Sequence, residues 1–187
     1  MVEWMELWMP ILAAAALVFV GSSVIHMVLG YHNGDYGELP NEDAVLEGMR
    51  SAGVGKGHYV FPYCMSMKDM GSPEMLAKYE RGPVGFLTLY PNGPMPVGKS
   101  LLQWFVYSIF AGICVAYVAR MTLSPDAEYM EVFRLTGTVA FLTYAGCSPT
   151  DSIWKGMRWS VTAKFLLDGV IYGALTGGAF GWLWPGA

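Results

Sequence analysis

The chain has 187 residues, of which 54% are hydrophobic and only 14% are charged. Soluble domains carry about a quarter charged residues, so this composition is typical of a membrane protein. The formal net charge of −4 argues against a nucleic-acid-binding protein, because such proteins present clustered Lys and Arg.

The first predicted element is a membrane-spanning helix over residues 9–29. This stretch is long enough to cross a hydrocarbon core of about 30 Å, and Pro10 suits the first turn of a helix. The residues before it include Glu3 and Glu6, whereas a signal peptide begins with basic residues. We therefore expect a retained span.

The long loop over residues 31–99 is predicted to form a small α+β domain. Capping and turn residues predict helices over about 40–53 and 72–82. Short aromatic and β-branched runs predict strands over 58–63 and 86–90. So few elements are marginal alone, so we expect this domain to rest on the membrane helices or on a partner.

Three further spans are predicted, over residues 101–119, 129–149 and 159–184. The middle one is the least regular, because its uninterrupted apolar character covers only residues 135–147, and a buried or re-entrant segment is the alternative. If Arg134 reaches the membrane surface, the full length can span. The expected fold is an all-α membrane protein, a four-span helical bundle with an α+β loop domain between the first two spans.

The distribution of Lys and Arg predicts the orientation. With four spans, the long loop and the loop over 148–158 share one side, and these loops hold most of the basic residues. The positive-inside rule then places both loops in the cytoplasm and both termini outside.

Glycine recurs at every fourth position of the last span, at Gly169, Gly173, Gly177 and Gly181. Overlapping G-x-x-x-G units let two helix backbones approach closely in lipid. The pattern predicts a packing face, either for a helix of the same bundle or for a helix of another protein.

Arg134, Lys164 and Asp168 lie within the predicted spans, where charge is costly. Lys164 and Asp168 are one helical turn apart and share a face. One interpretation is a self-neutralising pair that also reaches Arg134 or Glu131. The other is a polar path for a proton, an ion or a substrate.

The long loop contains a sulfur-rich stretch, Cys64, Met65, Met67 and Met70, with His58 upstream. Thiolate and thioether donors suit copper(I). However, the chain has 13 Met in all, so a local cluster is expected without any function. The spacing of a zinc site is absent, because no second cysteine lies nearby.

His26 lies in the first span and His32 just beyond it. A membrane histidine can hold haem or a chlorophyll-type pigment, and the alternative is a hydrogen bond to a neighbouring helix. No second histidine lies in a predicted span, which excludes a bis-histidine haem inside the bundle. No catalytic residue, metal or cofactor is predicted, and haem, a pigment and copper stay open.

Four stretches of the chain carry a resemblance: Leu39–Leu46, Phe61-Pro62, Gly82–Phe86 and Phe180–Pro185. Together they resemble a group of small bacterial inner-membrane proteins of similar length and no assigned activity. The resemblance implies a bacterial cytoplasmic membrane and adds no cofactor or site residue.

The function expected first is a non-catalytic accessory or scaffolding subunit of a larger energy-transducing complex, respiratory or photosynthetic. Its partner surfaces would be the helix over 159–184 and the loop over 31–99, because close-packing helix faces and aromatic-rich surfaces are typical of protein contacts. One alternative is a small oligomeric transporter or channel that uses Lys164, Asp168 and Arg134. Another is a membrane protein that binds a cofactor or metal.

Overall fold

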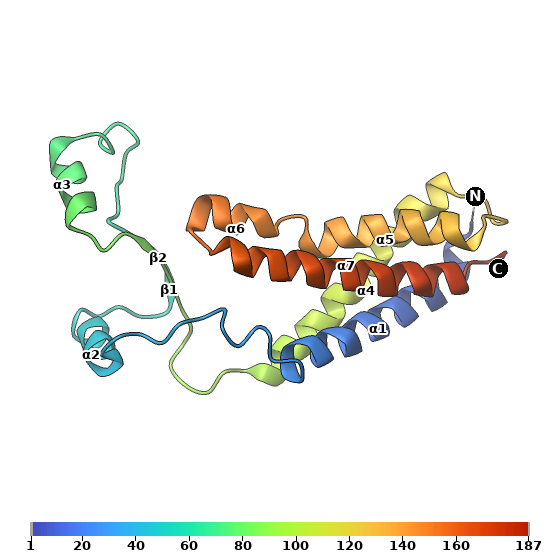
Figure 1. The fold of residues 1–187 in the computed structure, drawn as a ribbon, viewed down its shortest axis with the longest axis horizontal. Helices are drawn as coiled ribbons and strands as arrows, with labels where there is room; N and C mark the ends of the chain where they lie inside the picture. Colours follow the sequence, from blue (N-terminus) through green and yellow to red (C-terminus); the bar gives the residue numbers. More distant parts are fainter. Residues whose placement is uncertain (1, 187) are drawn as a thin grey trace. The chain divides into compact units, whose positions relative to one another are not determined.

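The computed structural model describes residues 2–186 and is mostly helical, with one small antiparallel sheet. The chain forms two compact units, one made of the residues up to Asp35 with those from Pro96 onward, and the other of Tyr36–Met95. The first unit contains η1 (Trp4–Glu6), α1 (Trp8–Met27), α4 (Val97–Thr122), α5 (Tyr129–Ala145), α6 (Ser148–Lys155) and α7 (Trp159–Trp182). The second contains α2 (Glu42–Ser51), β1 (Gly57–Phe61), α3 (Pro73–Arg81) and β2 (Gly85–Leu89) (Figure 1).

Four long helices make up most of the first unit. α5 and α7 run side by side in opposite directions, and α1 packs against both α7 and α4 (Figure 1). The helices meet through small side chains, which allow close approach. The buried alanines are Ala14 and Ala15 on α1, Ala111, Ala116 and Ala119 on α4, Ala140 and Ala145 on α5 and Ala179 on α7.

The glycine stripe of α7 faces α5 and consists of Gly169, Gly173, Gly177 and Gly181. A Cβ atom added at Gly173 would lie 2.8 Å from the carbonyl oxygen of Gly137, and one at Gly177 would lie 2.8 Å from that of Phe133. These distances leave no room for a side chain. The stripe is therefore covered by a helix of the same chain, one of the two partners expected for it.

The outer surface of the first unit is apolar. Large apolar side chains are exposed along α1 and α4, among them Leu12, Val20, Leu102, Phe110 and Ile113. The interior is mainly apolar and also holds six polar or charged side chains: Ser22, Ser108, Thr136, Thr162, Asp168 and Thr176. By length and composition, α1 and α4 are each able to cross a membrane.

The second unit contains the two helices and two strands predicted for the long loop. In the sheet, β1 pairs antiparallel with β2, and Tyr59 lies opposite Leu87. α3 begins with Pro73, and the hydroxyl of Ser72 accepts a hydrogen bond from the backbone N–H of Met75 at 3.2 Å. Ser72 therefore acts as the N-cap that its position predicts.

The structure differs from the prediction at the end of the third expected span. The helix predicted over 129–149 ends at Ala145, and a separate helix, α6, begins at Ser148. Pro149 explains the break, because its ring clashes with the carbonyl four residues earlier and it has no N–H to donate. In the first turn of α6 the same residue is tolerated.

The fourth helix, α4, is also longer than the predicted 101–119. Apolar character marks the part of a helix that suits lipid, and polar residues that form helices well can extend it at either end. Lys99 and Arg120 lie in these extensions.

Candidate metal centre

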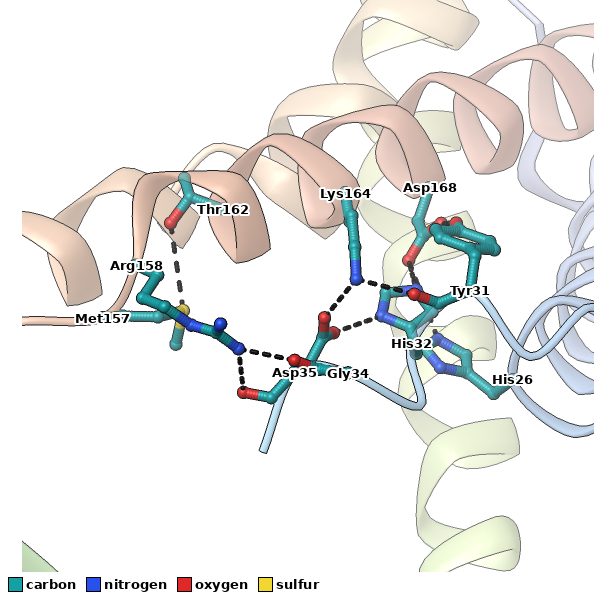
Figure 2. Close-up of polar contacts among 10 residues, drawn as sticks. All are labelled: His26, Tyr31, His32, Gly34, Asp35, Met157, Arg158, Thr162, Lys164 and Asp168. Carbon is teal, nitrogen blue, oxygen red and sulfur yellow. Dashed lines mark hydrogen bonds and ion pairs between the residues drawn. The ribbon is translucent and has the colours of Figure 1, made fainter. Parts of the chain in front are cut away.

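The segment that follows α1 folds back against α7 (Figure 2). Gly30 has a φ of +65°, a left-handed conformation that glycine adopts without strain. A turn follows, in which the backbone N–H of Asp35 donates to the carbonyl oxygen of His32 at 2.9 Å. These turns bring the side chains of Tyr31, His32 and Asp35 next to α7.

Three potential metal ligands converge there. Nε2 of His32 lies 2.9 Å from Oδ2 of Asp168, and Nε2 of His26 lies 3.7 Å from the same oxygen. The two imidazole rings are stacked, with centroids 4.3 Å apart. One ligand atom from each residue lies within 4.8 Å of the others, and among residues 2–186 this is the one group of three or more His, Cys, Asp or Glu side chains so placed.

Two of the three side chains are oriented by further hydrogen bonds. Nδ1 of His32 lies 2.6 Å from Oδ2 of Asp35, which turns Nε2 of the ring toward Asp168. The hydroxyl of Tyr31 donates to Oδ1 of Asp168, which leaves Oδ2 to the histidines. In metal sites, a histidine ligand is commonly held by a carboxylate on its other nitrogen, and a carboxylate ligand by a hydrogen-bond donor.

The carboxylate of Asp35 is held in turn by Lys164. Nζ of Lys164 lies 2.5 Å from Oδ1 of Asp35 and 2.6 Å from the carbonyl oxygen of Tyr31. Burial of the Asp35 side chain, which is 4% exposed, would raise the pKa of its carboxyl group. Hydrogen bonds from Lys164 and His32 and their charges outweigh burial, and they hold this pKa below its ordinary value. Asp35 is therefore a carboxylate, and its oxygen can accept a hydrogen bond from the Nδ1–H group of His32.

Arg158, the residue before α7, fixes the same segment through the main chain. Its Nη2 atom donates to the carbonyl oxygens of Gly34 and Asp35, at 2.5 and 3.0 Å. The position of the segment thus depends on two cations, Arg158 and Lys164, that bind backbone carbonyl groups (Figure 2).

The donor set fits a divalent transition metal. Two imidazole nitrogens and one carboxylate oxygen are ligands of zinc and of iron(II). Ligand atoms about 2.1 Å from a tetrahedral ion lie about 3.4 Å apart. The separations of 2.9 and 3.7 Å between the histidine Nε2 atoms and Oδ2 of Asp168 bracket that value. Three protein ligands leave a coordination position open, and His26 and Asp168 border a cavity of about 380 Å³.

No family model, no curated protein and no solved structure matches this chain. The chemistry of the centre is therefore inferred from its own residues.

The two charged residues of α7 belong to this centre, but their partners differ from those expected. Lys164 pairs with Asp35, and Asp168 faces His32, so the pair does not neutralise itself. Arg134 borders a separate cavity between α5 and α7. α5 and α7 are antiparallel, and Phe133, next to Arg134, lies against Gly177 of α7. Gly177 is 13 residues after Lys164, so Arg134 and Lys164 are separated by about 20 Å along the helix axis. The expected contact with Arg134 is therefore wrong, and these three residues share no common polar path.

The sulfur-rich stretch of the second unit forms no comparable cluster among the described residues. Nδ1 of His58 lies 3.1 Å from the hydroxyl oxygen of Thr88 on the neighbouring strand. The thiol of Cys64 donates to the carbonyl oxygen of Ser66. The methionine side chains are exposed: Met65, Met67 and Met70.

The sequence predicts His26 as a candidate ligand, but it does not predict the roles of Tyr31, His32 and Asp35. These three residues form no motif, and His32 is 136 residues from Asp168 in the chain. One signal was available. A Lys and an Asp inside a predicted span need partners of opposite charge, and His32 and Asp35 follow directly after another span.

Proposed function

We propose that the protein is a multi-pass membrane protein that holds a divalent transition-metal ion at His26, His32 and Asp168. One observation carries this proposal. Nε2 atoms of both histidines face a single carboxylate oxygen, while Asp35 and Tyr31 hold the far sides of His32 and Asp168. Ligands oriented in this way before an ion binds are a feature of metal sites.

The charges of the centre also support a bound cation. His32 lies between two carboxylates, and a neutral imidazole can donate a hydrogen bond to only one of them. Lys164 balances Asp35, and among residues 2–186 Asp168 forms no ion pair with a Lys or Arg side chain. A metal ion on the Nε2 side of His32 would supply the missing positive charge. The alternative is a metal-free network in which His32 is an imidazolium.

We propose that α1, α4, α5 and α7 all cross the membrane. Length and apolar composition support this for α1 and α4, whose exposed apolar side chains suit lipid. α5 and α7 pack with them in one unit, and both charged groups of α7 have partners. The resemblance and the positive-inside rule favour a bacterial cytoplasmic membrane with the long loop inside. The metal centre would then lie at the cytoplasmic surface, where α1 ends and α7 begins.

Metal analysis of the purified protein tests the proposal. The full chain is extracted in mild detergent, equilibrated with zinc or iron(II) and separated from unbound ion by gel filtration. We expect about one ion per chain for the natural protein. His32→Ala and Asp168→Ala should lose it, while His58→Ala, a histidine of the second unit, should retain it.

Circular dichroism and gel filtration of each variant show whether it is folded. A natural protein without a stoichiometric ion would contradict the proposal and favour the imidazolium network. Equal retention of the ion by folded His32→Ala would contradict it as well.

The accessory-subunit role and its larger complex stay a prediction. The glycine stripe does not support that role, because α5 already covers it. The transporter alternative also loses one of its residues, since Arg134 lies about 20 Å from Lys164.

A further inference from the structure

The cavity next to the metal centre lies where the four long helices meet. Its volume is about 380 Å³. It is lined by Ser22, Ser23, His26 and Met27 of α1, Leu101 and Trp104 of α4, Tyr144 of α5, and Phe165, Asp168 and Tyr172 of α7. Binding pockets for small molecules begin at about 300 Å³, so this space suits a single ring system and not a two-chain lipid.

The walls of the cavity favour a planar ring. Trp104, Tyr144 and Tyr172 pack against one another with ring centroids 5.5 to 6.0 Å apart. Their faces and edges are surfaces on which another ring can stack.

The polar atoms of the cavity favour a ring that carries oxygen. Tyr172 is only 5% exposed and borders the cavity, yet its hydroxyl makes no hydrogen bond with any of residues 2–186. Among the described residues, the buried side-chain atom without a hydrogen-bond partner is Oγ1 of Thr176, so the hydroxyl of Tyr172 is accessible and can donate to a ligand in the cavity. Asp168 lies one turn before Tyr172 on α7, about 6 Å along the axis, which is the scale of a six-membered ring with oxygens on opposite sides.

The charges around the cavity favour a neutral ring over a cationic ligand. An aromatic wall beside a carboxylate can also bind an ammonium group. Here, the hydroxyl of Tyr31 already donates to Oδ1 of Asp168, and the ring of His32 lies 2.9 Å from Oδ2. A bound metal ion would add positive charge at the same place. A neutral ring oxygen is therefore favoured over an ammonium group.

Two residues that line the cavity at the end of α1 are exposed, His26 with 42% of its side chain and Met27 with 73%. If α1 crosses the membrane, this end lies at the boundary between lipid and water. Amphipathic ring compounds with an apolar tail concentrate at that boundary, as tyrosine and tryptophan side chains do.

We propose that this cavity binds a lipid-soluble quinone or quinol, with its ring among Trp104, Tyr144 and Tyr172. One ring oxygen would accept a hydrogen bond from Tyr172, and the other would lie toward His26 and Asp168. This second contact rests on the proposed function in one respect, since the open position of the metal would face it.

Binding of a short-chain benzoquinone and of its quinol to the detergent-solubilised full chain tests this proposal. Titration calorimetry is performed on metal-loaded and on chelator-treated protein, and the metal content of each sample is measured. We expect saturable binding by the natural protein. Tyr172→Phe, which removes only the hydroxyl, should weaken it about three- to tenfold.

Tyr107→Phe is the matched control, because the Tyr107 hydroxyl donates to the carbonyl oxygen of Thr143 and does not border the cavity. We expect this variant to bind as the natural protein does. No saturable binding in either metal state, equal affinity of Tyr172→Phe, or preference for an alkylammonium compound would overturn the inference. If the protein binds a metal ion but no quinone, only the quinone inference is refuted. If it binds quinone but no metal ion, only the proposed function is refuted.

Discussion

The contact between α5 and α7 allows a quantitative test at one glycine. A Cβ atom at Gly173 would lie 2.8 Å from the carbonyl oxygen of Gly137, whereas ordinary van der Waals contact begins at 3.4 Å. The Gly173→Ala variant must therefore separate the two backbones by roughly half an ångström. Forcing an extra methyl group into a packed interface costs about 1–3 kcal/mol.

Gly178→Ala is the matched control, because the nearest atom to its added Cβ is the Tyr129 hydroxyl at 3.9 Å. Both substitutions gain the same helix propensity, up to about 1 kcal/mol, so the difference between them isolates the packing cost. In thermal unfolding in detergent, we expect Gly173→Ala to melt about 2–10 °C below Gly178→Ala. Equal melting temperatures would refute the close contact of α5 and α7.

Three further predictions concern the ion pair, the metal and the topology. Lys164→Met should destabilise the protein by more than about 1 kcal/mol, because it leaves the Asp35 carboxylate without its cation, and adding Asp35→Asn should recover part of the loss in the same melts. If Lys164→Met does not change the stability of the protein, the pair of Lys164 and Asp35 is not buried as described. A chelator should lower the melting temperature of the zinc-loaded protein, by an amount that corresponds to about 2.7 kcal/mol for free ion at 100 times Kd, and should leave folded His32→Ala unchanged. A shift of equal size in His32→Ala would point to another metal site. In intact cells, a membrane-impermeant maleimide should label Glu3→Cys but not the exposed native Cys147 until the membrane is permeabilised, and early labelling of Cys147 would contradict the proposed topology.

Local signals in the sequence were sufficient for most of the helices and strands. Ser72 and Pro73 marked the start of α3, and the last predicted helix, 159–184, is close to the observed Trp159–Trp182. These signals are capping residues, prolines and the length of apolar runs. Each acts over a few neighbouring residues, so it can be recognised in a short stretch of sequence. The predicted end of α5 at Pro149 is wrong, because a proline interferes with the carbonyl group four residues earlier and the helix ends at Ala145.

The metal centre could be predicted only in part. His26, Lys164 and Asp168 were identified because polar groups in apolar helices require a reason. Their partners could not be identified, since the position of His32 depends on a turn at Gly30 and on how α1 packs against α7. A contact between residues 136 positions apart is a property of the folded bundle, and no spacing rule contains it.

X-ray absorption at the zinc edge of the metal-loaded full chain tests the central claim most directly. The structure predicts a first shell of nitrogen and oxygen at about 2.0–2.1 Å, with the outer scattering of two imidazole rings. Folded His32→Ala should lose one of these rings. A sulfur ligand at about 2.3 Å, which would point to Cys64, or a shell without any imidazole, would contradict a centre built from His26, His32 and Asp168.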